Sequence, residues 1–158
     1  MVDRYPTTPE GAVKLREELR HLKDVERLKV SREIGVAREH GDLSENAEYH
    51  AAKERQGMIE ARVKDLEDKL SRAEVIDPSK LSGSRVAFGA KVTISNVDSG
   101  EEVTYRILGA EESNLDRGSI SITSPLARAL LGREVGDEVK VRMPAGERAY
   151  EVVSVEFG

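Results

Sequence analysis

Three carboxylates, Asp42, Glu45 and Glu48, fall within seven positions of one polar stretch, REHGDLSENAEYH, at residues 38–50. Hard divalent cations take oxygen ligands, and Mg²⁺ is usually held by one or two carboxylates together with phosphate oxygens and water. So few carboxylates do not make a dedicated site. They could complete a Mg²⁺ site whose other ligands come from another macromolecule, and we assign Asp42 and Glu45 to that role.

A structural role competes for the same two residues. The spacing D-x-x-E is that of a capping box, in which Asp42 would cap a following helix and Glu45 would reach back to the cap. A carboxylate has two oxygens and several lone pairs, so capping and metal binding are not exclusive.

Neighbouring polar residues are weaker candidates. Glu48 is best interpreted as a solvated helix residue, and Tyr49 as packing against the bend. His40 and His50 suggest a Zn²⁺ pair without a clear third ligand. Basic residues on both sides of the bend could contact phosphates, although ion pairing on a solvated face is the simpler role: Arg32, Arg38, Lys53 and Arg55.

Two helices are expected to carry this bend. The first is predicted from Thr8 to about Arg38, with Thr8 as N-cap and Pro9 in the first turn. Its apolar residues shift phase once along the helix: Leu15, Leu19, Leu22 and Val25, then Val30, Ile34 and Ala37. The second is predicted from about Glu45 to Ala73, with a heptad-like seam: Ala52, Ile59, Val63, Leu66, Leu70 and Ala73.

Gly41 is placed to end the first helix in a left-handed conformation. The short loop then predicts an antiparallel coiled-coil hairpin over residues 1–77, with an acidic tip at about 40–48 and a slender, Ala-rich end.

The pattern changes at Asp77-Pro78, which should stop the helix before a linker at 78–84. Short β-like runs separated by turn residues follow over 85–158. One helix interrupts them, with Ser124 as cap, Pro125 in its first turn and Gly132 as its stop. We therefore expect an α+β chain that ends in a small, mostly antiparallel β-sheet domain with one short helix.

Composition narrows the function further. The formal net charge of −5 argues against sequence-independent coating of DNA. The absence of cysteine excludes a thiolate metal site and a cysteine nucleophile. No apolar run approaches a membrane span, so we expect a soluble, cytoplasmic protein without a membrane partner. A hairpin that buries its own seam has no need of a dimer, which favours a monomer.

The stretch AREHGDLSENAEYHAAKERQG closely resembles the hairpin tip of the bacterial Gre transcript cleavage factors. The resemblance continues through LREEL, LEDKLSRAEVID, VTYRILG and SITSPLARALLGREVGDEV, so it spans essentially the whole chain. One type within that family is more basic along its hairpin. This acidic chain is closer to the other, less basic type.

The resemblance implies a transcription elongation factor that binds the secondary channel of bacterial RNA polymerase. An FKBP-like C-terminal domain would dock on the channel rim, with contacts around Ser124 and Pro125, while the hairpin enters the channel. Asp42 and Glu45 would then help to hold the polymerase's second, weakly bound Mg²⁺ and to position the attacking water. The polymerase itself would hydrolyse the backtracked nascent RNA, so the factor would be no enzyme alone.

The same resemblance suggests RNA contacts at Asn46, Lys53 and Arg55. Two other classes of function remain open from the residues. A peptidyl-prolyl isomerase would need an aromatic-lined proline pocket, for which the second half offers Phe88, Tyr105, Tyr150 and Phe157. A structural coiled-coil adaptor would make the acidic tip incidental.

Overall fold

The computed structural model describes residues 3–158, which form two compact units. The helical unit comprises Asp3 and Ala12–Ala73, and the sheet unit comprises Arg4–Gly11 and Glu74–Gly158. This division differs from the expected ranges of 1–77 and 85–158. The reason is a small two-stranded sheet that the sequence did not indicate, in which β1 (Tyr5–Thr7) pairs with β2 (Ala73–Val75).

The expected linker at 78–84 belongs to the sheet unit. Pro78 begins a short 3₁₀ turn, η3 (Pro78–Lys80), which Asp77 caps through the N–H of Ser79 at 3.0 Å. A Cβ built on Gly89 would lie 2.8 Å from the Pro78 ring, so the two residues are in close contact. The Ser84 hydroxyl donates to Glu134 at 2.6 Å. Both ends of this segment are thus attached to the sheet unit.

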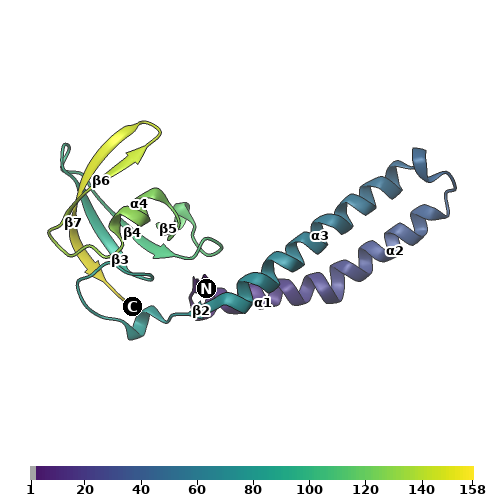
Figure 1. The fold of residues 1–158 in the computed structure, drawn as a ribbon, viewed down its shortest axis with the longest axis horizontal. Helices are drawn as coiled ribbons and strands as arrows, with labels where there is room; N and C mark the ends of the chain where they lie inside the picture. The colour runs from purple at the N-terminus through teal and green to yellow at the C-terminus, as the bar shows by residue number, and fades with distance from the viewer. Residues whose placement is uncertain (1–2) are drawn as a thin grey trace. The chain divides into compact units, whose positions relative to one another are not determined.

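The first predicted helix is present as three consecutive segments: α1 (Pro9–His21), a π-helical turn η1 (Leu22–Glu26) and α2 (Arg27–Arg38) (Figure 1). The start is as predicted, because the Thr8 hydroxyl accepts a hydrogen bond from the N–H of Gly11 at 3.0 Å.

The π-helical turn lies where the apolar pattern changes phase. A π turn holds more residues than an α turn, so it shifts the seam along the helix without breaking it. Val25, which lies in this turn, is 48 % exposed and does not belong to the seam, contrary to the prediction. Beyond the turn the predicted residues Val30, Ile34 and Ala37 are all buried.

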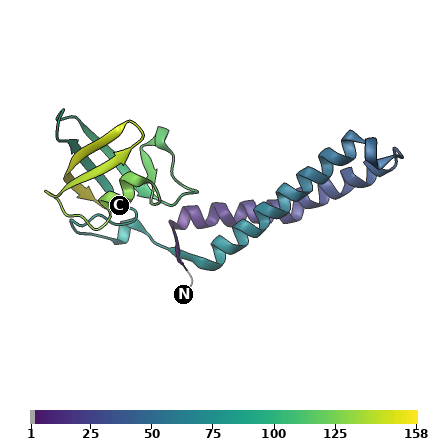
Figure 2. The ribbon, with the colours of Figure 1, turned by 45° about the horizontal axis from the view of Figure 1, so that its top comes forward.

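The second helix, α3 (Ala47–Arg72), runs antiparallel to α2, and the two lie side by side in both views (Figures 1 and 2). Its predicted seam is confirmed at Ala52, Val63 and Leu66, which are buried. Near the loop, Val30, Ile34 and Ala52 form a small apolar cluster against which Tyr49 and Ile59 pack.

Ion pairs between the two arms of the hairpin add to this packing. The Arg62 guanidinium binds both carboxylate oxygens of Glu18, at 2.7 and 2.9 Å. Arg27 pairs with Glu60 at 2.8 Å, and Arg55 pairs with Glu33. Such exposed pairs each contribute about 0–1 kcal/mol to the free energy of unfolding. They therefore help to align the two arms but stabilise the hairpin little.

The sheet unit contains a five-stranded sheet in the order β5-β4-β3-β7-β6. Its strands are β3 (Lys91–Asn96), β4 (Glu102–Leu108), β5 (Ser119–Ser121), β6 (Glu138–Met143) and β7 (Gly146–Glu156). Three of the four pairings are antiparallel and the pairing of β4 with β5 is parallel, which agrees with the expectation of a mostly antiparallel sheet. The connection between β4 and β5 is long enough for this crossover and includes the 3₁₀ turn η4 (Leu115–Arg117).

The predicted short helix is α4 (Pro125–Leu130). Ser124 caps it by accepting the N–H of Ala127 at 3.2 Å, and Gly132 follows with φ +83°. Ala127 and Leu130 are fully buried and join alternating residues of β3, β6 and β7 in one core: Val92, Ile94, Val139, Val141, Tyr150 and Val152. Within residues 3–158, no helix is both long and apolar enough to cross a membrane.

Candidate functional site

The carboxylates predicted to bind Mg²⁺ lie in the loop between α2 and α3, called here the tip (residues 39–46). The end of α2 tightens into 3₁₀-like bonds, from His40 N–H to the Ala37 carbonyl at 3.2 Å and from Gly41 N–H to the Arg38 carbonyl at 3.3 Å. Gly41 then takes φ +96°, the left-handed conformation predicted for it, and turns the chain towards Asp42.

Asp42 is exposed and forms a local turn with Ser44. One oxygen, Oδ1, accepts the Ser44 N–H at 3.0 Å and the Ser44 hydroxyl at 2.8 Å. The hydroxyl, and secondly the backbone N–H, lower the pKa of Asp42 below its usual value because both hydrogen bonds favour the ionised form. Asp42 is therefore anionic at neutral pH, with Oδ2 free of protein hydrogen bonds in the part of the chain described.

Glu45 ends a 3₁₀ turn, η2 (Leu43–Glu45), and is exposed. Its carboxylate makes no hydrogen bond or ion pair within residues 3–158. The capping-box interpretation is therefore wrong: within residues 3–158 Asp42 bonds to Ser44 and Glu45 does not reach back, and α3 begins two residues after Glu45. Both carboxylates are directed to solvent rather than to the start of the helix.

Asn46 is the residue that caps α3. Its side-chain Oδ1 accepts the N–H of Tyr49 at 3.0 Å, and its Nδ2 donates to the Ala37 carbonyl on α2 at 2.6 Å. We predicted Asp42 as the cap of this helix. Asn is as good an N-cap as Asp, so the sequence also allowed Asn46 in that role.

Tyr49 packs against the bend, as predicted. Its ring lies against the apolar cluster of the hairpin, and the Arg38 guanidinium carbon is 5.9 Å from the ring centroid. This contact places Arg38 over an aromatic face in cation–π geometry, so its charge is partly used within the hairpin.

The two histidines contact different partners. His40 lies 3.5 Å from Glu48, and His50 lies 3.3 Å from the Ser44 carbonyl. No group of three or more His, Cys, Asp or Glu side chains in the described chain is arranged to hold a metal ion. The donor set at the tip is two exposed carboxylates, which suits a hard cation with ligands from a second molecule better than Zn²⁺.

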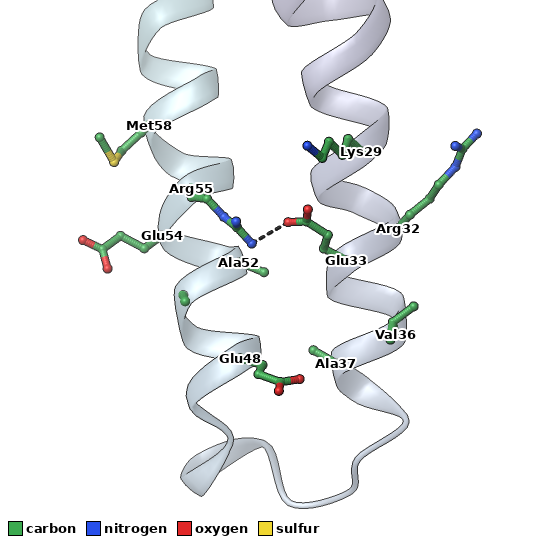
Figure 3. A pocket seen from close by; sticks show the side chains of 11 residues that line it. Lys29, Arg32, Glu33, Val36, Ala37, Glu48, Ala52, Glu54, Arg55 and Met58 are labelled. Atoms are coloured by element: carbon green, nitrogen blue, oxygen red, sulfur yellow. Dashed lines mark hydrogen bonds and ion pairs between the residues drawn. The ribbon is translucent and has the colours of Figure 1, made fainter.

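A groove of about 710 Å³ opens on the hairpin next to the tip. Figure 3 shows it between α2 and α3, with the ion pair of Glu33 and Arg55 across it and the small side chains of Ala37 and Ala52 below. Arg55, predicted to contact RNA, is therefore paired within the hairpin. Lys53, the other predicted cation, donates to Gln56 at 3.1 Å on the same helix.

Ser124 and Pro125, predicted to dock on a partner, lie in the sheet unit at the start of α4. Pro125 is exposed and Ser124 is half-buried, with its hydroxyl committed to the cap of the helix. The structure thus assigns Ser124 a structural role and leaves the Pro125 ring accessible.

Comparison with known proteins covers nearly the whole chain. Residues 5–75 match the family described as "Transcription elongation factor, N-terminal", and residues 81–157 match "Transcription elongation factor, GreA/GreB, C-term". The chain therefore belongs to the GreA/GreB family of transcription elongation factors, in agreement with the resemblance of its tip sequence.

Two relatives of known family agree with that assignment. The chain is 57 % identical over 156 residues to transcription elongation factor GreA of Hyphomonas neptunium, covering 99 % of both chains. It is 58 % identical over 158 residues to GreA of Desulfotalea psychrophila, covering 100 % of this chain and 98 % of the relative. Among solved structures, GreA factor homolog 1 of Thermus thermophilus is 30 % identical, with 98 % and 99 % coverage and a TM-score of 0.45.

Proposed function

We propose that this protein is a transcript cleavage factor that presents Asp42 and Glu45 to an incomplete Mg²⁺ site in bacterial RNA polymerase. One observation carries the proposal. Both carboxylates lie exposed at the tip of a hairpin, where Oδ2 of Asp42 and both oxygens of Glu45 have no protein partner among residues 3–158. Charges so placed contribute nothing to the packing of their own fold.

The residues fit the metal by their chemistry. Mg²⁺ prefers carboxylate and phosphate oxygens and keeps several waters, so two carboxylates from the tip would add to ligands from the polymerase and from RNA phosphate. When bound, the ion would supply charge stabilisation and a more acidic water for phosphodiester hydrolysis. Asp42 and Glu45 would hold the ion and orient the water, and no division of these roles between them is proposed.

The partner molecules are the polymerase and the 3′ end of the backtracked nascent RNA. The hydrolytic centre would be that of the polymerase, and the factor would have no nuclease activity alone. In this proposal α2 and α3 act as a coiled-coil hairpin within the secondary channel of the polymerase. The sheet unit acts as an FKBP-like domain on the channel rim, with Ser124 and Pro125 in the contact. The protein would act as a monomer in the cytoplasm.

The predicted RNA contacts differ in how well their side chains are placed. The exposed Lys53 ammonium donates to the Gln56 side-chain oxygen in a solvent-exposed hydrogen bond, which it can exchange for a phosphate at little cost. Arg55 would first have to leave Glu33 or share its charge with both groups. We therefore propose Lys53 as the stronger phosphate contact of the two.

A backtracked bacterial polymerase complex with 3′-labelled RNA tests the proposal. Wild-type protein with Mg²⁺ is expected to release short 3′ fragments, whereas Asp42→Asn with Glu45→Gln is expected to reduce the cleavage rate by about 10²-fold or more without loss of polymerase binding. Glu54→Gln, an exposed carboxylate on α3 away from the tip, is the matched control. Equal cleavage by wild type and the double variant would refute the role of the tip.

A proline isomerase is not favoured. Phe88 and Tyr150 are buried, and Tyr105 and Phe157 pack against the core that contains Tyr150, so these four aromatic residues serve packing. Proline-limited refolding of a test protein should therefore proceed at the same rate with and without this factor.

A further inference from the structure

The side-chain amide of Asn46 joins the two arms of the hairpin directly below the tip. Oδ1 accepts the N–H of Tyr49 on α3, and Nδ2 donates to the carbonyl of Ala37 on α2, with distances of 3.0 and 2.6 Å. Ala37 is the last buried residue of α2, with 3 % of its surface exposed. The amide therefore closes a loop from 37 to 46, and this loop contains both Asp42 and Glu45.

The carbonyl of Ala37 is open to this donor because α2 ends there. In a continuing α-helix the N–H of Gly41 would bond to it, but that N–H bonds to the Arg38 carbonyl instead, at 3.3 Å. The His40 N–H reaches the Ala37 oxygen at 3.2 Å, and the Asn46 amide supplies the second, shorter bond. A carbonyl oxygen has two lone pairs, so it can accept both bonds.

We propose that Asn46 is a positioning residue, which fixes the tip so that Asp42 and Glu45 are held at the reacting centre in one arrangement. This inference rests on the proposed function. An amide suits the position because it carries an acceptor and a donor on one short side chain, whereas aspartate has only acceptors. Serine or threonine caps a helix as well, but each side chain ends before the atom that corresponds to Nδ2.

This role differs from the RNA contact predicted for Asn46. The side chain is half-buried, and one donor and one acceptor are already used within the hairpin. A binding contact and a positioning role have different kinetic effects. Losing a contact raises the concentration of factor needed for half-maximal cleavage, whereas a displaced tip lowers the maximal rate.

The test compares Asn46→Ser and Asn46→Thr with wild type and with Ala47→Ser. Ala47 is the exposed neighbour of Asn46 at the first position of α3. The control therefore alters the same end of the helix and leaves both hydrogen bonds of Asn46 intact. Two quantities are measured: the cleavage rate as a function of factor concentration, and ¹⁵N relaxation of the Ser44 and Glu45 amides in the free protein.

For both Asn46 variants, the maximal cleavage rate should fall about tenfold with an unchanged half-saturating concentration, because small misplacements of catalytic groups are costly. Tip amides should become more mobile while the melting temperature changes little, since the cap is kept. Ala47→Ser should match wild type in every measurement.

A wild-type maximal rate in both Asn46 variants would overturn the inference, and so would an effect confined to the half-saturating concentration. Failure of wild-type protein to stimulate cleavage would instead refute the proposed function. The relaxation data would then still decide whether Asn46 orders the tip, because they need neither polymerase nor Mg²⁺.

Discussion

The Glu112 carboxylate accepts the backbone N–H of Thr8 at 2.9 Å, across 104 positions of sequence. It also accepts the hydroxyl of Thr7 at 2.7 Å and the hydroxyl of Thr8. Thr7 and Thr8 are buried, so one acidic side chain satisfies three donors where the chain enters α1. This contact ties residues 4–11 to the rest of the sheet unit.

Replacing Glu112 by Ala should lower the free energy of unfolding by about 1–3 kcal/mol, because buried donors lose their acceptor. Thermal and urea denaturation would measure the change. Asp116→Asn, an exposed carboxylate in the same connection, is the control and should change stability by less than about 0.5 kcal/mol. Equal stabilities for the two variants would show that the contact is not maintained in solution.

Two glycines in helical segments should respond in opposite directions to alanine. A Cβ on Gly11 would lie 2.5 Å from the Thr7 hydroxyl oxygen and 2.6 Å from Oε2 of Glu112, so Gly11→Ala should lower the melting temperature. Gly35 on α2 has nothing within 4 Å of such a Cβ, so Gly35→Ala should stabilise by about 0.5–1 kcal/mol. Calorimetry of the two variants checks both signs.

The Ser44 hydroxyl should tune the titration of Asp42. Because this hydrogen bond lowers the pKa of Asp42 in the folded protein, Ser44→Ala should raise that pKa towards its usual value. The bond favours the folded state above the unfolded pKa of Asp42, and its contribution is lost as the pH falls through the folded pKa. A ¹³C titration of the Asp42 carboxyl by NMR measures the shift, and an unchanged midpoint would contradict the Asp42–Ser44 turn.

The bidentate pair of Glu18 and Arg62 should couple the two arms of the hairpin. A double-mutant cycle with Glu18→Gln and Arg62→Gln should give a coupling energy of about 0.5–1 kcal/mol, since both side chains are partly exposed. High salt should reduce the coupling by screening. A cycle on Glu18 and Arg16 is the control, because that pair makes no contact in the structure.

Sequence patterns determined the features that depend on nearby residues. The two arms, their seam beyond Val30, the caps at Thr8 and Ser124 and the exposed acidic loop follow from local periodicity and capping chemistry. The phase slip between Val25 and Val30 also marked the position of the π-helical turn. These patterns could be recognised because each acts within a few turns of one element.

Tertiary structure decided the rest. Asp42 and Asn46 were both suitable caps for α3, and the choice depended on the Ala37 carbonyl of the other arm, to which the Asn46 amide donates. The parallel pairing of β4 with β5, and the attachment of Thr8 to Glu112, likewise join residues distant in sequence. Such choices depend on donors and acceptors that meet only after folding, so local propensity leaves them open.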